Sequence, residues 1–340
     1  MKKKNEGITI IRVLAMLSII LGHYCKMVGI NEYQLLSIGV EIFLFISGYL
    51  YGSKEIDNKL IWIGQRIKRL MLPYWFVLIV ITGVRLAFNY VVPNKLLLFN
   101  LFGIQGLNRI FLNLDTGSVQ GYGQTWFITI LWVCYILMLC FKYNNNMESF
   151  ITKRPKFSLV IGAIMQIGLA FLGIQTVYII CYFIGYFVSK RENWLTKRIY
   201  IAVTCLFLGL CVTRIFFRNA QDGTVLYDHI IARWSFVAMA IWLIMTCLII
   251  CNTYKQFSKN IVRMKIWIVM DYLSYPLFLT HFVFLNGSLA VNHYIFNMII
   301  QTIVFICLTV VFALIVVLIT DWKNARKIFC VECYPKNKHI

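Results

Sequence analysis

Long apolar runs with almost no charge recur along the whole chain of 340 residues. Only 14% of the residues are charged and 60% are hydrophobic, whereas a soluble domain carries about 25% charged residues. A run of about 20 apolar residues is long enough to cross a membrane as a helix. The pattern excludes an ordinary soluble enzyme, and it excludes a disordered chain because so much apolar surface favours folding. We therefore predict an all-α polytopic membrane protein.

Ten of these runs are candidate membrane spans, which predicts a bundle of about ten transmembrane helices. They cover residues 8–28, 35–52, 71–92, 125–141, 157–174, 175–189, 199–217, 229–251, 266–291 and 294–320. The first run follows a basic stretch that resembles the start of a signal peptide, but no small-residue cleavage site comes after it, so we expect it to be retained. Residues 8–320 thus form the predicted membrane domain, and 321–340 form a short basic cytoplasmic tail with no further domain after it.

The basic residues between the runs predict the orientation in the membrane. If the N-terminus is cytoplasmic, 25 of the 33 Lys and Arg residues fall in inner segments, four in outer loops and four (Arg12, Arg85, Arg214 and Arg233) inside the spans. Cytoplasmic loops carry an excess of Lys and Arg. We therefore expect both termini inside, and we attribute the net charge of +20 to topology and not to a nucleic-acid partner.

Two segments have less certain roles in this scheme. Residues 93–124 form a long outer loop with an apolar stretch too short to span, which could be a re-entrant helix, a lid, or a surface amphipathic helix. Cys330 and Cys333 make a single CxxC pair in the tail. One pair without a second is weak evidence for zinc, so we predict no metal site.

Ionisable residues inside the spans are the best functional clues, because each costs about 2.5–3.5 kcal/mol at the bilayer centre. The runs contain Glu41, Asp271, His23 and His281, with Arg12 near the inner end of the first run. Arg12 and His23 lie 11 positions apart, so on one helix they share a face about 16 Å apart. The imidazole could act as a general base. Alternatively, Arg12 reaches the interface as a snorkelling side chain and His23 is a packing residue.

A second basic pair stands in the next cytoplasmic segment. Arg66 and Arg69 are three positions apart, so they are neighbours on a helix and can bind phosphate through bidentate hydrogen bonds. Spacing alone does not separate this reading from an ordinary inside-positive flank.

Taken together, these segments resemble the acyltransferase 3 family of membrane O-acyltransferases. The resemblance rests on five segments in order: Arg12 to His23, the stretch Gly39-Val40-Glu41 to Ser47-Gly48, Arg66 and Arg69 before Pro73-Tyr74, Trp126-Phe127, and Leu273-Ser274-Tyr275 to His281. Two positions depart from the family pattern, since Leu44 replaces a Phe and Glu41 replaces the commoner Asp. The branch that acylates peptidoglycan often has a Glu where this chain has Leu131, which argues against peptidoglycan as the acceptor.

The resemblance implies an enzyme of the bacterial cytoplasmic membrane that moves an acyl group, most simply acetyl, from cytoplasmic acetyl-CoA to a sugar hydroxyl. The implied acceptor is a surface polysaccharide or its lipid-linked precursor. His23 is the expected base, Arg12 and Glu41 its support, and Arg66 and Arg69 the ligands of the CoA phosphates. Asp271 and His281 are weaker candidates, and Ser47-Gly48 fits close helix packing better than a nucleophile. A transporter of a glycan or lipid precursor is the alternative, because polar groups inside spans can also line a translocation path.

Overall fold

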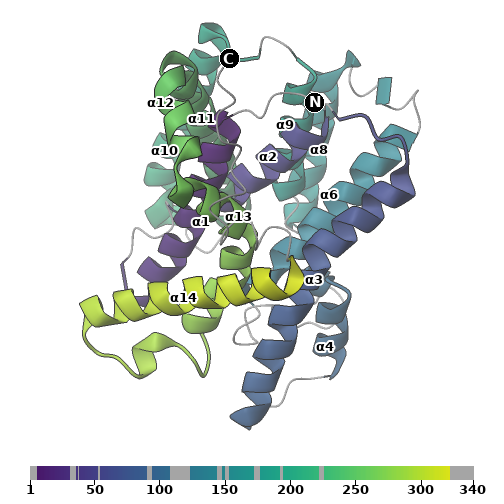
Figure 1. The fold of residues 1–340 in the computed structure, drawn as a ribbon. Helices are drawn as coiled ribbons and strands as arrows, with labels where there is room; N and C mark the ends of the chain where they lie inside the picture. The colour runs from purple at the N-terminus through teal and green to yellow at the C-terminus, as the bar shows by residue number, and fades with distance from the viewer. Residues whose placement is uncertain are drawn as a thin grey trace. The chain divides into compact units, whose positions relative to one another are not determined.

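The computed structural model describes residues 6–30, 36, 38–52, 54–89, 94–107, 123–143, 148–149, 153–171, 177–191, 194–221 and 226–321. All regular structure in these residues is helical, and none of them lies in a strand (Figure 1). The helices are α1 (Glu6–Met27), α2 (Gly39–Gly52), α3 (Lys59–Ala87), α4 (Asn94–Leu101), α6 (Trp126–Tyr143), α8 (Pro155–Phe171), α9 (Val177–Ser189), α10 (Lys197–Gln221), α11 (Ala232–Thr253), α12 (Lys255–Arg263), α13 (Lys265–Thr280) and α14 (Met298–Thr320). The all-α prediction is confirmed.

Seven helical segments among the described residues are long and apolar enough to cross a membrane, and three shorter apolar helices accompany them. The shorter ones are Gly39–Gly52, Phe157–Leu169 and Val177–Ser189. The chain is therefore a multi-pass membrane protein, while the number of ten spans and the cytoplasmic location of both termini stay predictions.

Two predicted spans have different bounds in the structure. The span expected at 71–92 belongs to α3, which begins at Lys59 and therefore carries the basic segment on the same helix. The span expected at 266–291 is shorter as an α-helix, because α13 ends at Thr280 and continues only as the short 3-10 helix η6 (His281–Phe284). Pro276 stands in the last turn of α13, where its missing N–H weakens the helical ladder.

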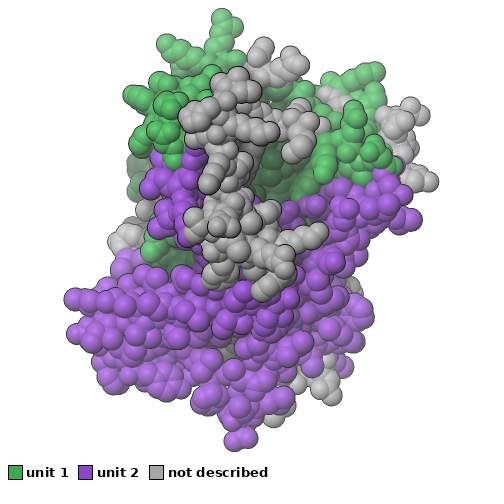
Figure 2. Space-filling model, in the orientation of Figure 1, with its two compact units in different colours: residues 1–22, 32–57, 130–260 green, residues 23–31, 58–129, 261–340 purple. Residues whose placement is uncertain are grey.

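The chain forms two compact units (Figure 2). Unit 1 comprises residues 1–22, 32–57 and 130–260, and unit 2 comprises residues 23–31, 58–129 and 261–340. Helix α1 contributes to both, with Gly22 the last residue in unit 1 and His23 the first in unit 2.

Unit 1 is built on the close contact of α2 with α9, and on the packing of α10 against α11. Gly48 and Gly185 make the first contact possible. A Cβ atom on Gly48 would lie 1.9 Å from the carbonyl oxygen of Tyr182, and one on Gly185 would lie 2.1 Å from that of Phe45. No real Cβ fits at such distances. The prediction that Ser47-Gly48 serves helix packing is thus supported by the neighbouring backbone.

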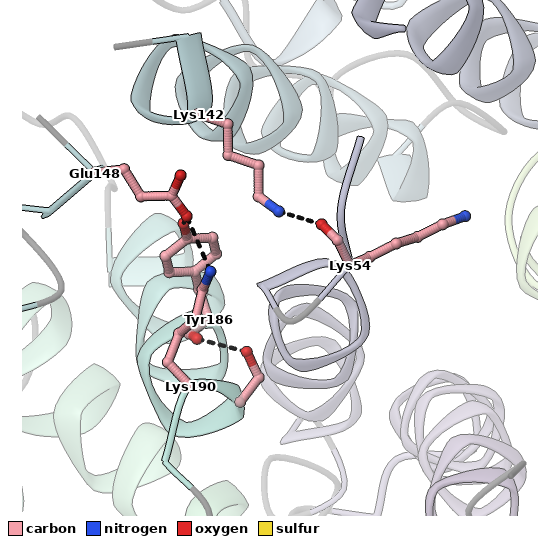
Figure 3. Close-up of polar contacts among 6 residues, drawn as sticks. Lys54, Lys142, Glu148, Tyr186 and Lys190 are labelled. Carbon is pink, nitrogen blue, oxygen red and sulfur yellow. Dashed lines mark hydrogen bonds and ion pairs between the residues drawn. The ribbon is translucent and has the colours of Figure 1, made fainter. Parts of the chain in front are cut away.

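Unit 1 carries a cluster of polar contacts around Glu148, Tyr186 and Lys190, with a contact of Lys142 beside it (Figure 3). Glu148 accepts hydrogen bonds of 2.9 Å from the Tyr186 hydroxyl and from Lys190 Nζ. Lys142 Nζ donates to the carbonyl oxygen of Lys54. The contacts tie together segments that the charge pattern assigns to the cytoplasmic side.

Unit 2 contains the predicted outer loop and packs α3, α13 and α14 against one another. The loop is partly helical, with α4 followed by the 3-10 helix η2 (Gln105–Leu107), and α4 contacts α3. Residues 108–122, the rest of that loop, lie outside the described residues, as do Cys330 and Cys333 in the predicted tail.

Candidate active site

The described part of unit 2 brings two histidines together from opposite ends of the sequence. His23 stands near the end of α1, and His281 begins η6 directly after α13. Their ring centroids lie 5.3 Å apart, with the planes inclined by 37°. His281 is completely buried and His23 is half-buried. His23, the base expected from the sequence, thus contacts His281, one of the two weaker candidates.

The turn at the end of α13 fixes the orientation of His281. Thr280 Oγ1 donates to the carbonyl of Pro276, and His281 Nδ1 lies 3.2 Å from the carbonyl oxygen of Leu277. A carbonyl oxygen only accepts hydrogen bonds, so Nδ1 carries the proton in this contact. In a neutral imidazole Nε2 then holds a lone pair. This Nε2 is buried and has no hydrogen-bond partner among the described residues.

Aromatic rings surround the two imidazoles. The Phe282 ring meets His23 edge-on at 5.2 Å and His281 at 6.1 Å between centroids. Phe278 lies 5.9 Å from His281 and packs against Phe127, 5.2 Å away. Phe127 belongs to the Trp-Phe pair noted in the sequence. His281 is fully buried among these rings, and polar interactions are stronger in such surroundings than in water.

Gln124 is a buried amide close to this turn that the sequence gave no reason to select. It belongs to the 3-10 helix η4 (Gly123–Thr125) that precedes α6. Its Nε2 donates to the carbonyl of Leu279 at 3.0 Å, two residues before His281. Its Oε1 is buried without a partner in the described part of the chain. The one available signal was its position two residues before Trp126.

A second group of buried polar side chains connects the segment predicted as an outer loop to α3 and η4. The Tyr74 hydroxyl lies 2.8 Å from the Asn100 carbonyl oxygen and 3.0 Å from its Oδ1. Thr125 Oγ1 lies 3.4 Å from the same Oδ1, and Gln105 Nε2 donates to the Thr125 carbonyl. Tyr74 follows the Pro73 of the arginine segment. The Pro-Tyr pair therefore connects α3 with α4, and through Thr125 with the start of α6.

The two arginines expected to bind phosphate lie on α3. Arg66 is half-buried, with its guanidinium carbon 5.6 Å from the centroid of the Trp62 ring, and Arg69 is exposed. One residue further on, the Leu70 carbonyl accepts a hydrogen bond of 2.9 Å from the Tyr275 hydroxyl of α13. This bond links the arginine segment of α3 to the helix that ends at His281.

Glu41 lies in unit 1 and is 1% exposed. The family resemblance implied that Glu41 supports His23, and in unit 1 the positive charge that acts on Glu41 is that of Arg233. Arg233 donates a hydrogen bond of 3.0 Å to the Tyr178 hydroxyl, and Cys181 Sγ donates to the Glu41 backbone carbonyl. Glu41 Oε2 has no hydrogen-bond partner among the described residues. The sequence had identified Arg233 only as a charge inside a span.

Arg12 and Asp271 are the remaining candidates from the sequence. Arg12 is half-buried on α1, which is one continuous helix from Glu6 to Met27, so Arg12 and His23 do share a helix face. Asp271 is half-buried on α13, and its backbone carbonyl accepts a hydrogen bond of 2.9 Å from Ser274.

Comparison with protein families finds a match to a family described as an acyltransferase domain, over residues 5–321. The chain belongs to the acyltransferase 3 family. The match covers nearly the whole chain, and with the apolar helices it makes this protein a membrane acyltransferase. Comparison with curated proteins and with solved structures finds no match.

Family membership gives the histidine pair its chemical meaning. Acyl transfer to a hydroxyl requires a group that removes the hydroxyl proton, and imidazole is the side chain that most often does so. In unit 2, His23 is half-buried, whereas His281 is fully buried. Of the two rings, His23 is therefore the more accessible.

Proposed function

We propose that the protein is an O-acyltransferase of the bacterial cytoplasmic membrane that moves an acetyl group from cytoplasmic acetyl-CoA to a sugar hydroxyl. The acceptor is a surface polysaccharide or its lipid-linked precursor. The observation that carries the proposal is the contact between His23 and His281 in a buried aromatic setting, within a chain of the acyltransferase 3 family.

His23 is the base in this proposal. It accepts the proton of the acceptor hydroxyl while the oxygen attacks the thioester carbonyl, and it returns that proton to the departing sulfur. The net change is one ester bond formed and one thioester bond broken, with CoA released as the thiol. An alternative mechanism, in which His23 carries the acetyl group for part of the cycle, forms and breaks the same bonds overall.

Charged residues are proposed to support this step. Arg66 and Arg69 hold the phosphates of CoA through charge-assisted hydrogen bonds, for which the guanidinium fork is suited. Arg12, on the same helix face as His23, supplies positive potential. Glu41 acts together with Arg233 as a compensated pair, which reduces the cost of keeping a carboxylate in apolar surroundings.

A transporter is the competing interpretation, and the buried Glu41 with Arg233 would suit that class too. The experiment that separates the two uses purified protein in nanodiscs with acetyl-CoA. An acyltransferase binds acetyl-CoA and releases CoA thiol when acceptor is present, while a transporter does neither. Mass spectrometry of surface glycans, with and without the gene, should show the corresponding acetyl mass difference. Identical glycans together with no binding of acetyl-CoA would refute the proposal.

A further inference from the structure

We propose that His281 is a positioning residue for His23, which accepts a hydrogen bond from that ring and fixes its tautomer. The inference rests on the proposed function, since it assigns the base a partner. Its basis is the geometry of the pair, which neither the family match nor the order of the sequence segments specifies.

The first step is the state of His281. The Leu277 carbonyl, 3.2 Å from Nδ1, holds the proton on that nitrogen and leaves a lone pair on Nε2. This atom is buried with no partner in the described part of the chain. Leaving a buried acceptor unpaired costs about 1–3 kcal/mol. A fully buried imidazole in this state needs a donor.

The second step identifies the donor. The His23 ring is 5.3 Å from the His281 ring between centroids, and the nitrogens lie on the rims of the rings. In the proposed arrangement, rotation of the His23 side chain brings an N–H to Nε2. Catalytic hydrogen bonds are often long in the absence of substrate and shorten once it binds. Phe282, edge-on to both rings, limits the other directions in which His23 can turn.

The third step is the consequence for catalysis. A catalytic histidine needs a group that accepts from one ring nitrogen, so that the other nitrogen keeps its lone pair for the substrate proton. In many enzymes a carboxylate takes this part. Lys26, three positions after His23 on α1, can only donate hydrogen bonds. In unit 2, His281 Nε2 is an unpaired acceptor on a ring that lies against the His23 ring.

The kinetic test uses two substitutions that separate the nitrogens of His281. His281→Asn keeps a donor near the Nδ1 position and removes the acceptor, whereas His281→Gln places an amide oxygen near the Nε2 position. We expect His281→Asn to lower kcat by about 10–100-fold, as loss of a histidine-orienting partner does elsewhere. KM for acetyl-CoA should stay near the wild-type value, and His281→Gln should retain most of kcat. A purely structural role would not give this pattern.

Matched controls are His293→Asn and His293→Gln, which change an exposed histidine of the same unit, in the 3-10 helix η7 (Val291–His293). Each variant is first checked for a monodisperse peak in detergent. Wild-type kcat in His281→Asn would overturn the inference, and so would an equal loss in well-folded His281→Gln.

A second measurement does not depend on the variants folding. The chain has five histidines, so selective ¹⁵N-histidine labelling gives few ring signals. We expect His281 to show a protonated Nδ1 and a bare Nε2, and the opposite tautomer would overturn the inference. If wild-type protein neither binds acetyl-CoA nor releases CoA, the proposed function fails and this role fails with it. An active wild type that tolerates His281→Asn refutes the positioning role alone.

Discussion

The two compact units bury different polar groups. In unit 1 the buried carboxylate of Glu41 lies within electrostatic range of Arg233, and the helices α2 and α9 approach so closely that Gly48 has no room for a methyl group. In unit 2 the buried polar groups include the imidazole of His281 and the amide of Gln124. Each unit holds buried acceptor atoms without a partner among the described residues, Glu41 Oε2 in unit 1 and His281 Nε2 and Gln124 Oε1 in unit 2. Substitutions of the packing glycines of unit 1 should therefore change mainly stability, and substitutions of the two histidines of unit 2 mainly activity.

The largest effect is expected for His23→Ala in unit 2. Loss of a general base lowers the rate by about 10²–10⁴-fold. Acetyl transfer to glycan, measured by mass spectrometry, should fall accordingly while membrane insertion and yield stay near normal. The control is Cys25→Ala on the same helix, which should keep full activity. Near-wild-type acetyl transfer by His23→Ala would show that His23 is not the catalytic base.

The next effect concerns the donor. The CoA phosphates do not change during the reaction, so Arg66 and Arg69 should bind ground state and transition state about equally. The double change to Ala should raise KM for acetyl-CoA at least about tenfold and leave kcat largely intact, since charge-assisted contacts contribute about 1.5–3 kcal/mol each. Lys at both positions should restore only part of the binding.

Lys68→Ala is the matched control for this experiment, because it removes one exposed charge from the same turn of α3. Acetyl-CoA binding is measured for the double variant beside His23→Ala. Normal binding by the arginine variant, together with lost binding by His23→Ala, would invert the roles assigned to these residues.

A smaller effect, on stability, is expected for Gly48→Ala in unit 1. The added methyl would meet the Tyr182 carbonyl, and overpacking of this kind typically costs about 1–3 kcal/mol. Gly209→Ala on α10 is the control, since nothing lies within 4 Å of a Cβ there, and it should be neutral or slightly stabilising. Thermal unfolding in detergent measures both. Equal midpoints for the two variants would contradict the account of α2 and α9.

The smallest effect is expected at Glu148, in the cluster of Figure 3. Partial burial acts to raise the pKa of Glu148, but hydrogen bonds from Lys190 and Tyr186 outweigh it, and the pKa lies below its ordinary value. The carboxylate therefore stabilises the fold at pH values above the unfolded pKa of about 4.3, and this contribution is lost as pH falls through the lower folded value.

Glu148→Gln should accordingly reduce stability by no more than about 1 kcal/mol at pH 7, and the difference from wild type should shrink as the pH is lowered from 7 to below about 4.3. Unfolding midpoints across this pH range test the effect. A difference that grows on acidification would show that the carboxylate does not favour the charged form in the folded protein.

The sequence by itself determined the class of the protein. Apolar runs with charge only between them predicted helices and membrane spans, since a helix satisfies its backbone within the bilayer. The Arg12 and His23 spacing placed both on one helix face, because that follows from helical geometry alone. The order of the five segments was enough to indicate the family that the match over residues 5–321 then showed.

Only the tertiary structure decided which polar groups meet. His23 and His281 are 258 positions apart, and their contact depends on how α1 packs against the end of α13. Glu41 proved to lie within electrostatic range of Arg233, and the only sequence signal for Gln124 was its position two residues before Trp126. The physical reason is that helices in lipid are apolar on nearly every side, so their hydrophobic pattern carries little information about which face meets which partner. Small residues and hydrogen bonds at the contacts make that choice, and these become visible only once the helices are packed.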